Sequence, residues 1–104
     1  MKEIEIKGVK YILRNILRNF FVYEEIKGKP FSFGKLIDEY LLFYCTLIAN
    51  NETFSISFDE FIAVCDECPQ LFAVYKSFVI SELERQAQAA NFDAGKSTKK
   101  KKSR

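Results

Sequence analysis

The chain contains no histidine and no tryptophan, and only two prolines and four glycines among its 104 residues. Without histidine it lacks the side chain that most often acts as a general base or metal ligand near neutral pH. It also has no glycine-rich phosphate loop, no G-x-S-x-G motif and no H-E-x-x-H motif. Acidic pairs such as Asp59-Glu60 and Asp66-Glu67 could suggest catalytic carboxylates. Each pair adjoins apolar helical positions, however, which is typical of the solvent-exposed face of a helix. We therefore expect a protein that is not an enzyme and uses no cofactor.

Cysteine is scarce as well, with Cys45, Cys65 and Cys68 as its only positions. No segment at the start of the chain has the pattern of a secretion signal, so we expect a cytosolic protein with free thiols. Cys65-Asp-Glu-Cys68 matches C-x-x-C, but a structural zinc needs four ligands, and the acidic residues between the two thiols would raise their pKa values. A metal shared across a dimer and a redox role are the alternatives.

The stretch NNETFSISFDEFIAV, residues 50–64, resembles the second half of an EF-hand loop. If Glu60 were loop position 12, position 1 would be Ala49, which offers no oxygen, and position 6 would be Phe54 where the loop needs glycine. Ser57 followed by Glu60 ahead of an apolar run fits a helix capping box instead. We therefore expect no calcium or other metal site here.

No apolar run is long enough to cross a membrane; the longest, YLLFYCTLIA at residues 40–49, is about half the required length. Eleven phenylalanines and five tyrosines supply a large apolar core for one small domain. The net charge of +2 is unevenly divided. Residues 1–92 hold ten basic against thirteen acidic residues, whereas residues 93–104 hold six against one. We predict a single domain over 1–92 and a disordered basic tail over 93–104.

The first residues alternate as two short strands. Ile4 and Ile6 share one face, the second run has Val9, Tyr11 and Leu13, and Lys7-Gly8 is the turn. Helical spacing follows from residue 15, with Ile16, Leu17, Phe20, Phe21, Tyr23 and Ile26 on one apolar face, and Gly28 and Pro30 end that helix. Ser32 is the expected cap of a central helix to about residue 49.

Two further helices are expected after that central one. The third begins at the Ser57 capping box, and the fourth has Pro69 in its first turn. The predicted class is α+β and mostly α-helical, with a short β-hairpin packed on about four helices. On the fourth helix, four apolar residues extend around more than one stripe, so part of it is either wedged into the core or faces a partner. The candidate partner-binding residues are Phe72, Tyr75, Phe78 and Val79.

This order of elements resembles the tail assembly chaperones of long-tailed phages and prophages. The resemblance covers about residues 3–85, through FVYEEIKGKPF, YLLFYCTLIANN and FDEFIAVCDECPQLF. It implies a non-enzymatic chaperone in the cytoplasm of the bacterial host. Such a chaperone coats and solubilises the tape measure protein, recruits the tail tube protein, can form homo-oligomers and is absent from the mature virion.

The lysine run Lys99–Lys102 allows two further hypotheses. In many such phages a ribosomal frameshift yields a longer form, and AAA and AAG codons at this run would suit slippage. The alternative function is a small nucleic-acid-associated accessory protein that binds through this basic tail by releasing counterions. We do not expect nucleic-acid binding by the body, because it is acidic and has no basic stripe.

Overall fold

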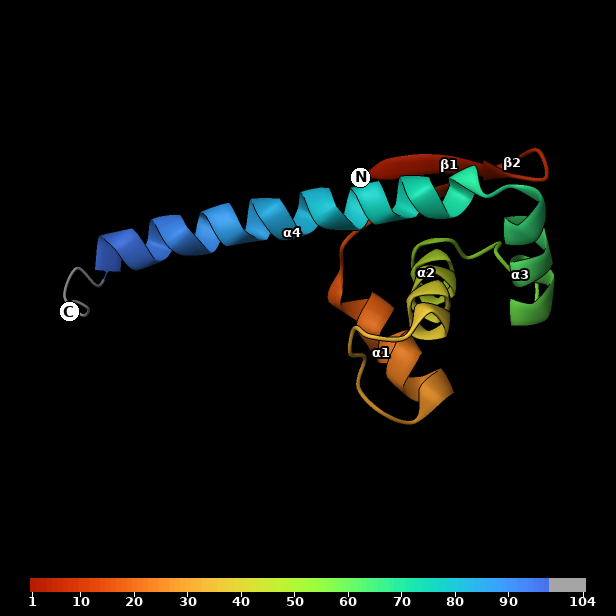
Figure 1. Cartoon of the computed structure of the whole chain (residues 1–104), viewed down its shortest axis with the longest axis horizontal. Helices are drawn as coiled ribbons and strands as arrows, with labels where there is room; N and C mark the ends of the chain where they lie inside the picture. Colours follow the sequence, from red (N-terminus) through yellow and green to blue (C-terminus); the bar gives the residue numbers. More distant parts are fainter. Residues whose placement is uncertain (98–104) are drawn as a thin grey trace.

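The computed structural model describes residues 1–97, with side chains to residue 88. Residues 2–97 form a two-stranded hairpin and then four helices. The helices α1, α2 and α3 and the hairpin form a compact body, and the second half of α4 projects beyond it (Figure 1). The predicted α+β, mostly helical class is confirmed. The expected tail falls largely on residues 98–104, outside the described residues, while α4 continues to Ser97, past the expected boundary at residue 92.

The hairpin consists of β1 (Lys2–Ile6) and β2 (Val9–Leu13), which pair antiparallel with Ile4 opposite Tyr11. Lys7 and Gly8 form the two-residue turn, with φ of 52° and 81°. Positive φ at both positions is what a type I′ turn requires, and its twist matches that of the strands. Ile4 and Ile6 are buried, as their alternation predicts.

The first helix, α1 (Leu17–Lys27), ends at Gly28, whose φ of 84° and bond from its N–H to the Glu24 carbonyl form the predicted left-handed cap. The apolar face of α1 is only partly covered. Tyr23 is buried against α2, but Leu17, Phe21 and Ile26 are each at least half exposed.

The central helix, α2 (Leu36–Asn50), begins later than the sequence indicated. Lys35 is its N-cap residue and Ser32 is not, because Gly34 has a φ of 140° that no helix accommodates. Residues 31–35 are therefore a non-helical connection. Phe31 anchors it by edge-to-face packing on Tyr23, with ring centroids 5.2 Å apart.

The capping box is confirmed at the start of α3 (Phe58–Glu67). The Glu60 N–H donates to Ser57 Oγ at 3.1 Å, and the Ser57 N–H donates to Glu60 Oε1 at 3.0 Å. The last helix, α4 (Gln70–Ser97), starts directly after Pro69. Pro69 therefore lies at the helix entry, where its missing N–H breaks no helical bond.

The main core lies where α2, α3, α4 and the hairpin meet, and its centre is aromatic. Phe43 of α2 is fully buried, stacks on Tyr75 with ring centroids 4.3 Å apart, and packs edge-to-face on Phe61 of α3 at 5.0 Å. A second cluster around Tyr23, Leu41, Leu42 and Cys45 joins α1 to α2. Among residues 1–97, no helix is long and apolar enough to cross a membrane.

Candidate functional site

Two of the four predicted partner-binding residues lie inside the body. Tyr75 and Phe78 of α4 are 3% and 9% exposed and belong to the main core. Burial raises the pKa of Tyr75 well above its usual value. These two rings fix α4 on the body, so any contact they make with a partner would require α4 to move.

The other two predicted residues are half-buried. The Phe72 ring stacks on Tyr40 of α2, with centroids 3.9 Å apart and planes at 12°. Lys76 Nζ lies 5.7 Å from the Phe72 centroid and 2.5 Å from Glu39 Oε1. Phe72 thus belongs to a contact between α4 and α2 and is only partly exposed.

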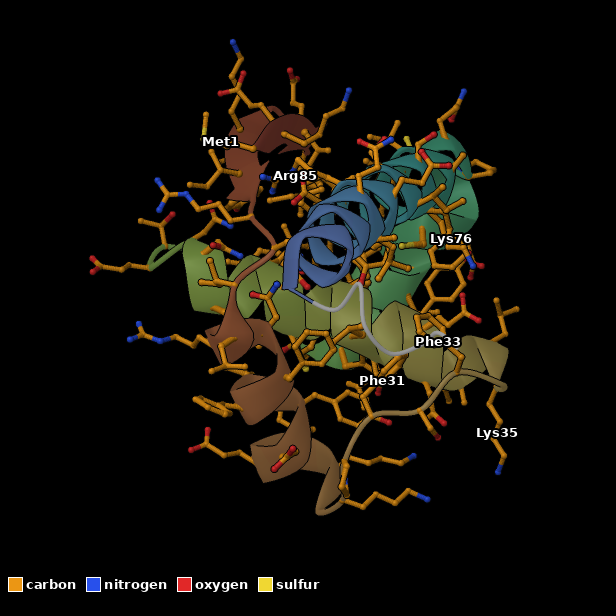
Figure 2. The ribbon with its side chains drawn as sticks, turned by 90° about the vertical axis from the view of Figure 1, so that its left-hand side faces the viewer. Met1, Phe31, Phe33, Lys35, Lys76 and Arg85 are labelled. Carbon is orange, nitrogen blue, oxygen red and sulfur yellow. The ribbon has the colours of Figure 1, made fainter. Side chains whose placement is uncertain are left out.

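Val79 lines a small cavity that is bordered by α4 and by the connection carrying Phe33. Figure 2 labels Phe31 and Phe33 on this connection. The cavity holds about 80 Å³ and is lined in part by Phe20, Phe33, Tyr75, Phe78, Val79 and Leu83. Phe33 is 62% exposed and Leu83 is 48% exposed. Apolar side chains from α1, the connection and α4 therefore border this cavity.

A larger apolar groove lies between α2 and α3. It has a volume of about 500 Å³ and is lined by Leu36, Ile37, Tyr40, Phe58, Ile62, Cys65 and Asp66. Leu36 and Ile37 are 63% and 59% exposed, an unusual state for aliphatic side chains that stand together. Asp66 carries the only carboxylate among these lining residues. This α2–α3 groove is therefore a mostly apolar concavity that is open to solvent and large enough for several side chains.

Local sequence features build both walls of the α2–α3 groove. Gly34 delays the start of α2, so Leu36 and Ile37 fall in its first turn, where no element covers them. The Ser57 capping box fixes the start of α3 and with it Phe58. The Tyr44 hydroxyl donates to the Ile56 carbonyl at 2.7 Å, which ties the preceding loop to α2. The groove is thus a fixed feature of the body.

An ion pair supports the same end of α2 from α1. Lys27 Nζ lies 3.2 Å from Asp38 Oδ1, and Asp38 is largely buried. Burial opposes ionisation of Asp38, but the Lys27 ammonium and the nearby Tyr23 hydroxyl outweigh burial and hold the pKa of the carboxyl below its usual value. Asp38 also lies in the first turn of α2, where the helix dipole favours an anion.

The three cysteines are free thiols in different surroundings: Cys45 and Cys65 are buried and Cys68 is exposed. Burial raises the pKa of Cys45 to about 12 and, with Asp66 nearby, that of Cys65 to about 11. A thiol in this state is a poor nucleophile, and Cys65 therefore does not have the lowered pKa that redox motifs use. Cys65 contributes to the groove as an apolar wall.

No group of three or more metal-ligating side chains comes together within the described part of the chain. Glu60, the residue at the end of the EF-hand-like stretch, directs its carboxylate to the Ser57 N–H. Its hydrogen bonds to Ser57 lower the pKa of the carboxyl. The Ser57–Glu60 capping box therefore explains the residues that resemble the end of a calcium-binding loop.

No protein-family model matches the chain, and no match was found among the curated proteins or the solved structures. The sequence-based prediction missed Leu36, Ile37 and Phe33, the residues that expose the most apolar surface near the two concavities. One signal was present: Phe33-Gly34 separates Ser32 from the apolar run, and glycine there moves the helix start toward Leu36.

Proposed function

We propose that this chain is a non-enzymatic phage tail assembly chaperone that binds and solubilises the tape measure protein while the tail is built. The observation that carries the proposal is the α2–α3 groove, where Leu36 and Ile37 stand exposed beside a 500 Å³ apolar concavity. A tape measure protein is a very long helix with apolar stripes, and such a helix needs a cover until it is packed in the tail. The resemblance of residues 3–85 to these chaperones supports the same function.

The groove suits one face of an amphipathic helix. Apolar side chains at positions i, i+3, i+4 and i+7 of a bound helix would enter between α2 and α3, with the ring edges of Tyr40 and Phe58 against them. The exposed Leu36 and Ile37 would cover the rim. One such contact is weak, but many copies along a tape measure protein act together, and each is released easily when the tail tube replaces it.

The proposal places the chaperone in the cytoplasm of the bacterial host and leaves it out of the mature virion. Its partners are the tape measure protein and the tail tube protein, and neighbouring copies on one tape measure helix form a homo-oligomeric coat. The lack of a membrane-crossing helix in residues 1–97 is compatible with this setting.

Co-expression with the tape measure protein tests the proposal. We expect the native chain to keep the tape measure protein in the soluble fraction and to elute with it. The double variant Leu36→Ser/Ile37→Ser is expected to lose most of this effect and keep its fold, because both side chains are exposed. The matched control is Leu17→Ser/Phe21→Ser on α1, which removes similar exposed apolar area outside the groove. Equal loss in both variants, or no loss in either, contradicts the assignment to the groove.

A change in the basic tail alone distinguishes the chaperone proposal from the nucleic-acid alternative. Replacing Lys99–Lys102 with serine removes four positive charges. We expect tape measure solubility to be unchanged. Salt-sensitive binding to DNA or RNA that disappears with these lysines would favour the alternative.

A further inference from the structure

The two edges of the hairpin differ in how their backbone groups are satisfied. On the β2 side, the Ile12 N–H donates to Asn51 Oδ1 at 2.8 Å, and Asn51 Nδ2 donates to the Ile12 carbonyl at 2.9 Å. The asparagine amide thus supplies the pair of bonds that a third strand would supply. The β2 edge of the hairpin is therefore closed at Ile12.

The β1 side has no such closure. Because Ile12 directs its N–H and carbonyl away from β1, its partner Glu3 directs its own away from β2, and Glu5 does the same one repeat further. Within residues 1–97 these outward groups of Glu3 and Glu5 make no hydrogen bond to the protein. The β1 edge therefore presents two donors and two acceptors at the spacing of a β-ladder.

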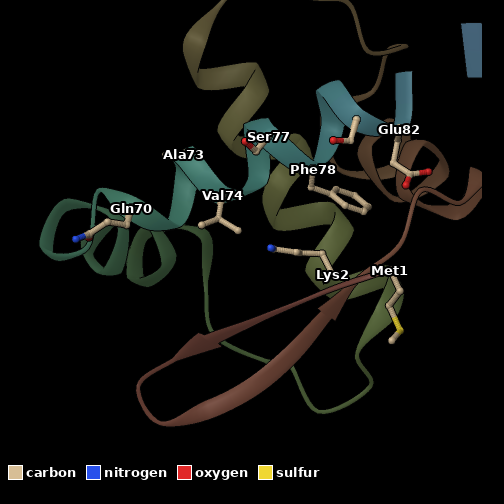
Figure 3. A pocket seen from close by; sticks show the side chains of 9 residues that line it. Met1, Lys2, Gln70, Ala73, Val74, Ser77, Phe78 and Glu82 are labelled. Carbon is tan, nitrogen blue, oxygen red and sulfur yellow. The ribbon is translucent and has the colours of Figure 1, made fainter. Parts of the chain in front are cut away.

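A groove runs beside this edge, between β1 and the start of α4. One part, of about 280 Å³, is lined by residues 2–5 of β1 together with Cys68, Gln70, Leu71 and Val74. It shares Lys2, Gln70 and Val74 with a second part of about 570 Å³ that reaches Phe78 and Glu82. Figure 3 shows Val74 and Phe78 extending from α4 toward the hairpin, with Lys2 between them. The α4 wall of the groove thus combines apolar side chains, among them Leu71 and Val74, with polar ones, and it faces an open strand edge.

We propose that this groove binds an extended segment of another protein as a third strand on β1, a segment in which basic side chains alternate with apolar ones. Its backbone would pair with Glu3 and Glu5, and its apolar side chains would face Leu71 and Val74. Its basic side chains would lie beside the glutamates on the exposed face, where opposite charges on neighbouring strands attract. This strand site is separate from the α2–α3 groove and does not depend on the chaperone proposal.

The glutamates also distinguish this occupant from a second copy of the chain. Two β1 strands paired antiparallel about a two-fold axis place glutamate across from glutamate, which destabilises a sheet. Of the two acids, Glu5 already faces Lys10 across the hairpin, whereas Glu3 faces Ile12. Glu3 therefore has the larger unbalanced charge for a basic strand to meet.

A synthetic peptide, acetyl-Thr-Lys-Val-Lys-Val-Lys-Thr-amide, tests the site in an NMR titration of the full chain. We expect shifts at the Glu3 and Glu5 amides and at Val74, and slower hydrogen exchange of both glutamate amides. The same peptide with alternate backbone nitrogens methylated keeps its charges and loses its donors, and it should bind at least about tenfold more weakly. Replacing its lysines with glutamate should also weaken binding.

Variants of the chain give the complementary test. Glu3→Pro removes the outward N–H without removing a hairpin bond and should abolish binding, while Glu3→Gln should weaken it more than Glu5→Gln does. Circular dichroism checks that the proline variant keeps its fold; if it does not, Val74→Arg, which obstructs the groove from α4, replaces it. Equal binding of the methylated peptide, or unchanged binding by both Glu3→Pro and Val74→Arg, overturns the proposal. So does a dimer in sedimentation experiments that Glu3→Pro dissociates, because the occupant would then be a second copy.

Discussion

At the residue scale, a few polar side chains join elements that are distant in sequence. Asn51 bonds both backbone groups of Ile12, and Asn50 Nδ2 bonds Asn19 Oδ1 at 3.2 Å, so the end of α2 holds the hairpin and the start of α1 together. The sequence predicted only that the central helix ends at about residue 49, because composition does not say which backbone groups the amides of Asn50 and Asn51 will meet. These bonds depend on the tertiary fold.

Asn51→Ala tests the closure of the β2 edge. It leaves the N–H and carbonyl of Ile12 without their partner at a half-buried position, so we expect a loss of about 1–3 kcal/mol in the free energy of unfolding. Denaturant titration measures it. Glu52→Ala, at the exposed neighbouring position, should change stability by less than about 0.5 kcal/mol. Equal effects of the two variants would show that the asparagine amide does not stabilise the hairpin.

The Lys27–Asp38 pair predicts that the stability of the fold depends on pH in the acidic range. The pKa of Asp38 is lowered in the folded chain, so its contribution to stability is fully present above the ordinary carboxyl value of 3.8 and is lost as the pH falls through the lowered value. The Lys27→Met variant removes the ammonium group that stabilises the ionised carboxylate, while burial still favours the neutral form. We therefore expect the pKa of Asp38 to rise in this variant. Carbon NMR of the carboxyl group measures both titrations. An unchanged pKa in Lys27→Met, with Lys10→Met as the control, contradicts this account.

At the scale of elements, local signals determine where most helices begin and end. Lys7-Gly8, Gly28, the Ser57–Glu60 box and Pro69 are recognisable from the sequence, and each lies at the predicted boundary. The start of α2 was predicted at Ser32 and is wrong, because Ser32 is a good cap only where the next residues can be helical and Gly34 is not. The predictable boundaries are those that one or two residues decide.

Removing the cap hydroxyl tests how much the box contributes to α3. Ser57→Ala should lower the free energy of unfolding by about 1 kcal/mol, because the Glu60 N–H loses its acceptor. Ser55→Ala, an exposed serine in the same loop, is the control and should have little effect. Thermal or denaturant unfolding compares the two. If Ser57→Ala is as stable as Ser55→Ala, the capping box does not stabilise α3 or the groove wall that α3 forms.

At the scale of the whole molecule, the sequence predicted the element order and the large aromatic core, but not which rings would be outside. Tyr75 and Phe78 are inside because α4 packs its first half across α2 and α3, and that packing depends on all three helices together. Among residues 1–88, most of the exposed large apolar side chains lie instead on α1, the 31–35 connection, the start of α2 and the middle of α4, and two more, Met1 and Val9, lie in the hairpin region. The outside of the body is thus apolar in places.

The central claim is that the α2–α3 groove binds an amphipathic helix. The most direct measurement is an NMR titration of the chain with helical peptides taken from the apolar stripes of the tape measure protein. The account predicts saturable shifts at Leu36, Ile37 and Ile62 that Leu36→Ser/Ile37→Ser abolishes and Leu17→Ser/Phe21→Ser leaves unchanged. Binding that leaves Leu36, Ile37 and Ile62 unperturbed, or no binding by any stripe, would contradict it.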